Sequence, residues 1–300
     1  MNGMTVADLG KLTEDDARAM LEAIRWPKGP VCPHCGALDC STKLAANGKA
    51  RAGLYQCNDC RGQFTVTVDS IFEDSHIPLS KWVLAFGLMC SSKKGISALQ
   101  LQRNLGLGSY KSAWFMAHRI RYAMAVGPFP PKLRGTVEVD ETFVGAARKG
   151  KRGRGAANKT PVLALVSRSG QARAKVIGRT TKQELHGAIL EGVRRDGRIM
   201  TDELPSYLGV GQHFAGGHHT VAHGKREYAR GDAHVNTAES FFALLKRGIF
   251  GTFHHVSKRH LGRYTDEFTF RWNHRKVNDG ARTVSALQAT TGKRLTYRAG

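Results

Sequence analysis

At 300 residues, the chain suggests about two domains, or one larger domain with a small appendage. Lysine and arginine number 46 against 24 aspartates and glutamates, and the formal charge of +22 points to a polyanionic partner. With 41% hydrophobic and 23% charged residues, the composition excludes intrinsic disorder. No apolar run is long enough to span a bilayer, and the N-terminus lacks the pattern of a signal peptide. We therefore expect a bacterial cytoplasmic protein that does not contact the membrane.

Four of the six cysteines form two CxxC pairs, namely Cys32, Cys35, Cys57 and Cys60. Each pair lets two thiolates reach one ion, and two such pairs complete a tetrahedral shell. We predict a zinc ribbon with a structural Zn²⁺ within residues 15–75, in which short alternating stretches form strands. A disulfide framework does not fit a reducing compartment, and a redox CxxC would not occur twice. His34 is a weaker ligand candidate, whereas Cys40 and Cys90 lack partners at metal spacing.

Residues 76–127 are predicted to form a helical, DNA-binding segment. Residues 79–90 are apolar with helical spacing, and 95–108 lead through a glycine-containing turn into a further helix at 109–125. A helix-turn-helix would place this last helix in a DNA major groove, and its candidate DNA contacts are Lys111, Arg119 and Arg121. The alternative is an αα-hairpin that packs on its neighbours, and the strong positive charge favours the DNA interpretation.

A basic, glycine-rich run follows the proline-containing linker and a β-rich stretch. This run, residues 148–155, is too charged to pack in a core, so we predict a mobile loop that lies along DNA phosphates. A solvated loop without a partner is the alternative. The candidate DNA contacts in this loop are Arg148, Lys149, Lys151, Arg152 and Arg154.

The order of elements in residues 132–290 predicts a ribonuclease-H-like α/β fold. The expected elements are a strand at 136–144, a hairpin at 161–168 and 171–178, a helix at 181–195 and a strand at 198–201. One acid lies on the first strand and another just after the fourth, so a third is expected from a later helix. The helix at 233–248 offers one, because Asn236, Glu239 and Lys246 share one side and apolar residues occupy the other.

Three acids are predicted to converge on divalent cations, namely Asp140, Asp202 and Glu239. Oxygen ligands suit Mg²⁺ or Mn²⁺, and two ions roughly 4 Å apart can clamp both oxygens of an in-line phosphoryl transfer. Lys246, two turns after Glu239, would reach phosphate as a point charge. Glu141 and Glu203 are adjacent to the favoured aspartates, and we expect their side chains to point away because strand neighbours alternate.

The sequence around these acids resembles the insertion-sequence transposases of the ISXO-type DDE family. The matching stretches include 139–145, 201–203, 234–248, 251–257 and 270–275, and the resemblance covers about residues 15–290 with its CxxC ribbon. It implies a DDE recombinase that cleaves DNA at the transposon ends and joins the freed 3′ hydroxyl to target DNA without a covalent enzyme intermediate.

The resemblance also implies roles for particular residues. Asp140, Asp202 and Glu239 would hold two Mg²⁺ or Mn²⁺ ions, with Lys246 close to the DNA. Related members carry an asparagine in the third motif, so Asn236 is a rival or auxiliary metal ligand. The implied partners are the terminal inverted repeats of the element and target DNA, in the nucleoid, and pairing of two DNA ends implies a homo-oligomer.

Two other functions remain open from the sequence. One is a non-catalytic, zinc-ribbon DNA-binding protein derived from a transposase, and the presence of all three acids and Lys246 argues against it. The other is an endonuclease of the same fold, which would cut DNA but not join strands. Strand-transfer activity distinguishes the endonuclease from the transposase.

Overall fold

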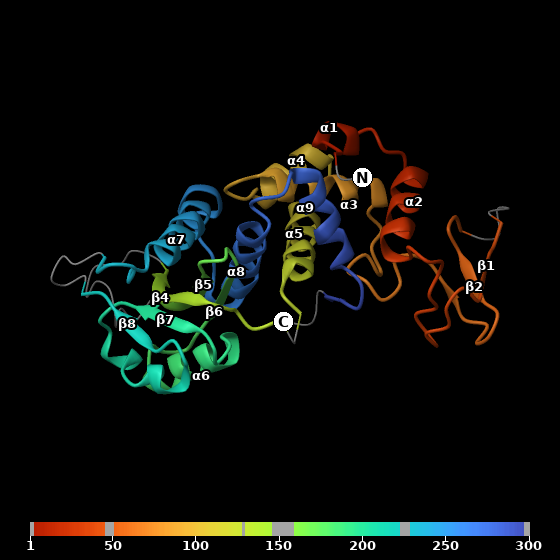
Figure 1. The fold of residues 1–300 in the computed structure, drawn as a ribbon. Coiled ribbons are helices and arrows are strands. Elements are labelled where there is room, and N and C mark those ends of the chain that lie inside the picture. Colours follow the sequence, from red (N-terminus) through yellow and green to blue (C-terminus); the bar gives the residue numbers. More distant parts are fainter. Residues whose placement is uncertain (1–2, 46–50, 128–129, 146–158, 223–228, 297–300) are drawn as a thin grey trace. The chain divides into compact units, whose positions relative to one another are not determined.

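The computed structural model describes residues 3–45, 51–127, 130–145, 159–222 and 229–296 (Figure 1). The chain divides into two compact units, one of residues 1–124 with 277–300 and one of residues 125–276. The predicted DNA contacts of the basic loop, Arg148, Lys149, Lys151, Arg152 and Arg154, lie outside the described residues. In the described part of the chain, no helix has both the length and the apolar character needed to cross a membrane.

The first unit begins with two helices and a small sheet. Its first elements are α1 (Val6–Leu9), α2 (Glu14–Arg25), β1 (Ser41–Lys43), β2 (Tyr55–Cys57) and β3 (Gln63–Phe64). Capping boxes at Thr5 and Thr13 start the helices, and the strands form an antiparallel sheet in the order β1-β2-β3. β3 ends at Phe64, and just beyond it the Arg25 guanidinium donates hydrogen bonds to the carbonyls of Val66 and Val68.

Three of the remaining helices of this unit lie within residues 76–127, and a fourth comes from the C-terminal end of the chain. They are α3 (Leu79–Ser91), α4 (Ala98–Leu105), α5 (Tyr110–Met124) and, from the C-terminal end, α9 (Asp279–Gln288). Gly106 ends α4 in the left-handed conformation, with φ 57°, where a glycine fits without strain. Arg282 of α9 donates from Nη1 to the Cys90 carbonyl at 2.8 Å. Residues 277–300 therefore belong to this unit, and the second unit ends at residue 276.

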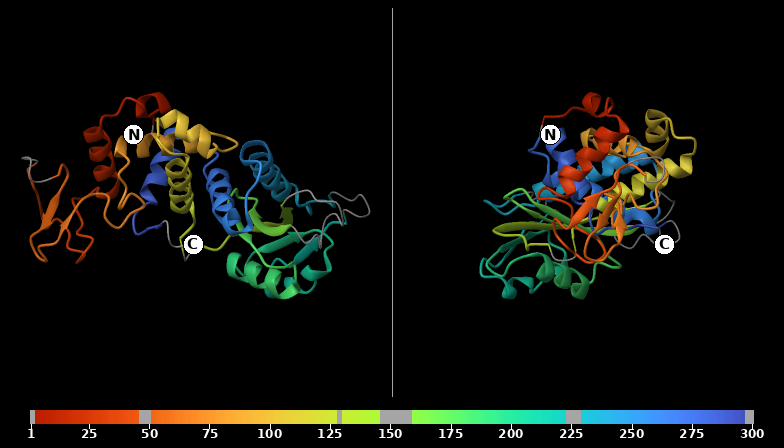
Figure 2. Two further views of the ribbon diagram at one scale, coloured as in Figure 1. Left: turned by 180° about the vertical axis from the view of Figure 1, so that it is seen from behind. Right: turned by 90° about the vertical axis from the view of Figure 1, so that its right-hand side faces the viewer.

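The second unit is a five-stranded sheet between two layers of helices (Figures 1 and 2). Its strands are β4 (Thr136–Val144), β5 (Thr160–Ser167), β6 (Ala172–Val176), β7 (Arg198–Thr201) and β8 (His218–Thr220). The order is β6-β5-β4-β7-β8; β4, β5 and β6 are antiparallel, and β7 runs parallel to both β4 and β8. This mixed sheet, with its flanking helices, confirms the predicted ribonuclease-H-like α/β fold.

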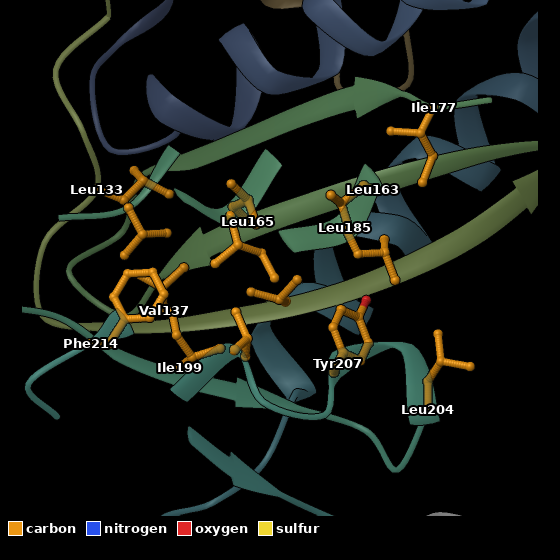
Figure 3. Packing of buried hydrophobic residues seen from close by; sticks show 14 residues of the cluster. Leu133, Val137, Leu163, Leu165, Ile177, Leu185, Ile199, Leu204, Tyr207 and Phe214 are labelled. Atoms are coloured by element: carbon orange, nitrogen blue, oxygen red, sulfur yellow. The ribbon is translucent and has the colours of Figure 1, made fainter. Parts of the chain in front are cut away.

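Each face of the sheet has its own helices and core. One face carries α6 (Lys182–Gly192) and the 3-10 helices η1 (Pro205–Tyr207) and η2 (Val210–His213), and its core includes Val137, Val139 and Tyr207 (Figure 3). The other face carries α7 (Asn236–Gly248), the π-helical turn η4 (Ile249–Phe253) and α8 (Lys258–Asn273). Because neighbouring residues of β4 alternate between faces, Glu138 and Asp140 point to the α7 side.

Candidate functional site

The four predicted zinc ligands form one compact cluster. Each offers a sulfur, and all four sulfurs lie within 4.8 Å of one another. The sulfurs of Cys32 and Cys60 lie 3.6 Å apart and those of Cys35 and Cys57 3.7 Å apart. Zinc–sulfur bonds of about 2.3 Å in a tetrahedron put neighbouring sulfurs roughly 3.8 Å apart, whereas a disulfide needs about 2.05 Å. The donor set therefore fits a structural Zn²⁺ ion.

The backbone around the cluster supports the same interpretation. Burial opposes ionisation of the Cys32 thiol, but hydrogen bonds from the backbone N–H groups of Cys35 and His34 and from the thiols of Cys35 and Cys60 together lower its pKa to about 7. Nε2 of His34 lies 3.1 Å from the Gln63 carbonyl oxygen, outside the cysteine cluster. A Cβ on Gly62 would come within 2.7 Å of the His34 ring, so a larger residue here would force that ring to shift. The ribbon fold is therefore built around the four sulfurs.

The three predicted acids come from three different elements of the second unit. Asp140 lies on β4, Asp202 follows the last residue of β7, and Glu239 lies in the first turn of α7. Asp140 and Asp202 are half-buried and Glu239 is exposed. Asp202 is held by its own turn, because its Oδ1 accepts the Leu204 N–H at 3.0 Å.

The electrostatics of Asp140 connect these acids. Burial, together with the charges of Glu141, Asp202 and Glu239, raises the pKa of Asp140 to about 7, against the lowering effect of the Glu141 N–H. Among the described residues, only the cysteines form a group of three or more with all ligand atoms within 4.8 Å. The three carboxylates thus interact electrostatically without being gathered within that distance, and their oxygen donors are of the kind that suits Mg²⁺ or Mn²⁺.

The neighbouring acid Glu141 belongs to the opposite face of the sheet. Its Oε2 accepts a hydrogen bond of 2.7 Å from the Tyr207 hydroxyl, inside the core shown in Figure 3. Burial and this carboxylate raise the pKa of Tyr207 well above its usual value. The expectation that Glu141 points away from Asp140 is confirmed.

The first turn of α7 carries both candidates for the third metal ligand. Asn236 is the first residue of the helix and Glu239 is the fourth, and both are exposed. Lys246 lies exposed in the last turn of the same helix. The second core covers the opposite side of α7 with Phe241, Phe242 and Leu245, as the helical period predicts.

A further acid near the site, which the sequence analysis did not single out, is Glu138. It is fully buried on β4, and its carboxylate accepts hydrogen bonds from the backbone of Thr237 and Ala238 in α7. The sequence feature that could have indicated Glu138 is its position in the same strand, two residues before Asp140 and therefore on the same face.

The predictions for α5 need a correction. Arg119 and Arg121 are buried, with only 6% and 2% of their surface exposed, so neither presents a charge to DNA. Arg119 instead donates to the carbonyls of Ile71, Glu73 and Leu295 and holds three segments of its unit together. Lys111 lies exposed in the first turn of α5, beside the exposed ring of Tyr110. Only the start of α5 therefore remains a candidate for DNA contact.

Comparisons with known proteins match both units. Residues 132–273 match the model of an ISXO2-like transposase domain, and residues 12–63 match that of a transposase zinc-ribbon domain. A Halobacterium salinarum relative, described as an uncharacterized protein in transposable element ISH50, is 30% identical over 277 residues, which cover 87% of this chain and 91% of the relative.

One solved structure gives a weak likeness. It is described as a simian T-cell lymphotropic virus intasome in complex with PP2A regulatory subunit B56 gamma; the match covers 55% of this chain and 63% of that chain at 16% identity. Its TM-score of 0.31 is too low to carry an argument. The two family models and the relative are sufficient: this chain belongs to the family of ISXO2-like transposases that carry an N-terminal zinc ribbon.

Proposed function

We propose that this chain catalyses DNA transposition at the open acidic site of its second unit. The observation that carries the proposal is the placement of Asp140 on β4, Asp202 directly after β7 and Glu239 in the first turn of α7, within a domain that matches a transposase family; the raised pKa of Asp140 agrees with it. Divalent ions bound there would stabilise charge on the attacking and leaving oxygens of a phosphoryl transfer. Asp140, Asp202 and Glu239 would hold these ions, with Asn236 as rival or auxiliary ligand.

The other residues of the site would place the DNA. Lys246 presents its ammonium group on α7, on the helix that carries Glu239, and can contact a phosphate as a point charge. The net charge of +22 supplies attraction for a polyanion. We further propose that Lys111 at the start of α5 and the zinc ribbon contact the DNA, which comprises the terminal repeats and the target. A homo-oligomer would bring two ends together.

A strand-transfer assay tests this proposal against the two alternatives. Purified chain, a labelled duplex carrying the end of the element and a target plasmid are incubated with Mg²⁺ or Mn²⁺. The proposal predicts a joined product. Cleavage without joining would favour an endonuclease, and DNA binding without cleavage would favour a non-catalytic derivative.

The same assay with Glu239→Gln and Asn236→Ala distinguishes the candidate third ligands. Because a carboxylate binds a hard cation more strongly than an amide does, we expect Glu239→Gln to abolish joining. Asn236→Ala should only reduce it. The reverse order of effects would assign the third ligand to Asn236.

A further inference from the structure

We propose that Glu138 is a positioning residue, which fixes the start of α7 against β4 and thereby places the third metal ligand opposite Asp140. The inference rests on the proposed function for its metal-binding part. Its structural part concerns only the contact between β4 and α7, so the two can be tested separately.

The carboxylate of Glu138 is fully buried and binds the start of α7 through both oxygens. Oε2 accepts the backbone N–H groups of Thr237 and Ala238 at 2.7 and 3.1 Å. Oε1 accepts the Thr237 hydroxyl at 3.0 Å. Three hydrogen bonds thus connect one strand side chain to one helical turn.

These bonds replace a cap that the helix itself does not provide. The N-cap position of α7 is Val235, whose side chain makes no capping hydrogen bond. The first N–H groups of a helix need acceptors, and a carboxylate is favoured there by the helix dipole. Glu138, which is distant in sequence, supplies the hydrogen-bond acceptors and the negative charge, so the start of α7 depends on β4.

Two basic side chains surround the same carboxylate. Arg168 Nε donates to Oε1 at 2.9 Å and offsets the buried charge. The same guanidinium donates from Nη2 to the His234 carbonyl at 3.3 Å, just before α7. Nδ1 of His234 lies 3.2 Å from Oε1, outside hydrogen-bond geometry. Arg168 therefore holds the chain that enters α7 as well as the carboxylate that caps it.

The position of this contact couples it to the proposed metal site. Glu138 and Asp140 point to the same side of β4, two residues or about 6.8 Å apart. Thr237 and Ala238 lie between Asn236 and Glu239, the two candidates for the third ligand. A shift of α7 by one residue would turn its side chains by roughly 100° and change which of them faces Asp140. Glu138 therefore selects the helical register.

Glu138→Gln tests the inference, because the amide NH₂ would face N–H donors where an oxygen now accepts them. The matched control is Glu267→Gln, which removes another fully buried carboxylate of the second unit, paired with Arg271 at 2.6 Å within α8. Hydrogen exchange followed by mass spectrometry reports on residues 236–241, and electron paramagnetic resonance reports Mn²⁺ affinity. Both use the full-length chain.

We expect Glu138→Gln to speed amide exchange at Thr237 and Ala238 at least about tenfold and to weaken Mn²⁺ binding by about 10- to 100-fold, as loss of a group that orients a ligand does. Glu267→Gln should leave both unchanged. Arg168→Lys, a milder variant, keeps the charge but not the fork that reaches the His234 carbonyl, and should give a smaller change of the same kind.

Two results of the exchange experiment would overturn the positioning role: unchanged exchange at the start of α7 in Glu138→Gln, or faster exchange spread evenly over the second unit. Mn²⁺ binding that is weakened by Asp140→Asn but not by Glu138→Gln would also contradict it, while leaving the proposed function intact. Binding that Asp140→Asn does not weaken would overturn the proposed ligand set instead, and exchange alone would then decide whether Glu138 caps α7.

Discussion

The zinc ribbon and the proposed acidic site both use metal-ligand side chains, but the chain assembles them differently. In the ribbon, two local CxxC turns bring four sulfurs together, with contacts of 3.6 and 3.7 Å across the turns. In the acidic site, the three carboxylates come from β4, the end of β7 and the start of α7. The ribbon is a closed set of four ligands, and the acidic site is open.

This difference follows from the chemistry of the ligands and their tasks. Thiols can approach one another as neutral groups, whereas ionised carboxylates repel, and this repulsion adds to burial in raising the pKa of Asp140. A structural site gains from closure, and a site for phosphoryl transfer must leave coordination positions for substrate oxygens. The acidic site therefore depends on residues that are not ligands but position them, such as Glu138 through its contact with α7.

The largest expected effect concerns the closed site. Cys57→Ser should abolish zinc binding and unfold residues 12–63, because structural zinc contributes on the order of 10 kcal/mol to the folding of such small domains. Zinc content by elemental mass spectrometry and DNA-end binding by fluorescence anisotropy would measure this. Cys40→Ser is the control, since the Cys40 thiol donates a hydrogen bond to Asp59 and is not part of the cluster. Intact DNA binding by Cys57→Ser would show that the ribbon is dispensable.

The open site should lose activity without losing its fold. Asp202→Asn should lower the cleavage rate at least about 1,000-fold, because the lost ligand removes several kcal/mol of charge stabilisation. DNA affinity should change less than about twofold, since the basic surface remains. Asp196→Asn, which alters an exposed acid paired with Arg194, is the control in the same unit. Normal cleavage by Asp202→Asn would refute its role.

A third prediction uses the raised pKa of Asp140, about 7, to separate stability from function. A folded-state pKa above the unfolded value means that ionisation destabilises the fold, so stability falls as pH rises from about 4 to 7. Asp140→Asn removes this penalty, on the order of a few kcal/mol. With chelator present, its Tm should exceed that of the wild type at pH 8 and match it near pH 4. A lower Tm at pH 8 would contradict the electrostatic account.

The smallest expected effect concerns Lys246. Lys246→Ala should weaken DNA binding by on the order of 1 kcal/mol and reduce the slope of log affinity against log salt by about 1, because one phosphate contact is lost. Anisotropy titrations over a range of salt concentrations measure both quantities. Lys175→Ala is the control, because Lys175 is exposed and paired with Glu191. Equal slopes for the two variants would remove Lys246 from the DNA interface.

Most of the fold could be predicted from local sequence patterns. The bounds of β4 and the zinc-ligand spacing follow from alternation and from CxxC turns, which depend on near neighbours. Arg119 and Arg121 were placed at the DNA because helical spacing does not show what covers a helix. The carbonyls that bind Arg119, from the chain around Ile71 and from Leu295, are distant in sequence.

The acidic site could be predicted only in outline. The order of acids along the chain indicated Asp140, Asp202 and Glu239, but their relative placement depends on how α7 meets β4. That contact is made by Glu138, whose partners lie far along the chain, so no periodicity could indicate it. The choice between Asn236 and Glu239 is of the same kind.

Locating the ions directly is the most stringent test of the central claim. Crystals of the full-length chain with a DNA end and Mn²⁺, measured at a wavelength where manganese scatters anomalously, would give the ion positions. The account predicts anomalous peaks about 2.0–2.4 Å from carboxylate oxygens of Asp140, Asp202 and Glu239. Peaks bound by other residues, or no peak at these acids while DNA is present, would contradict it.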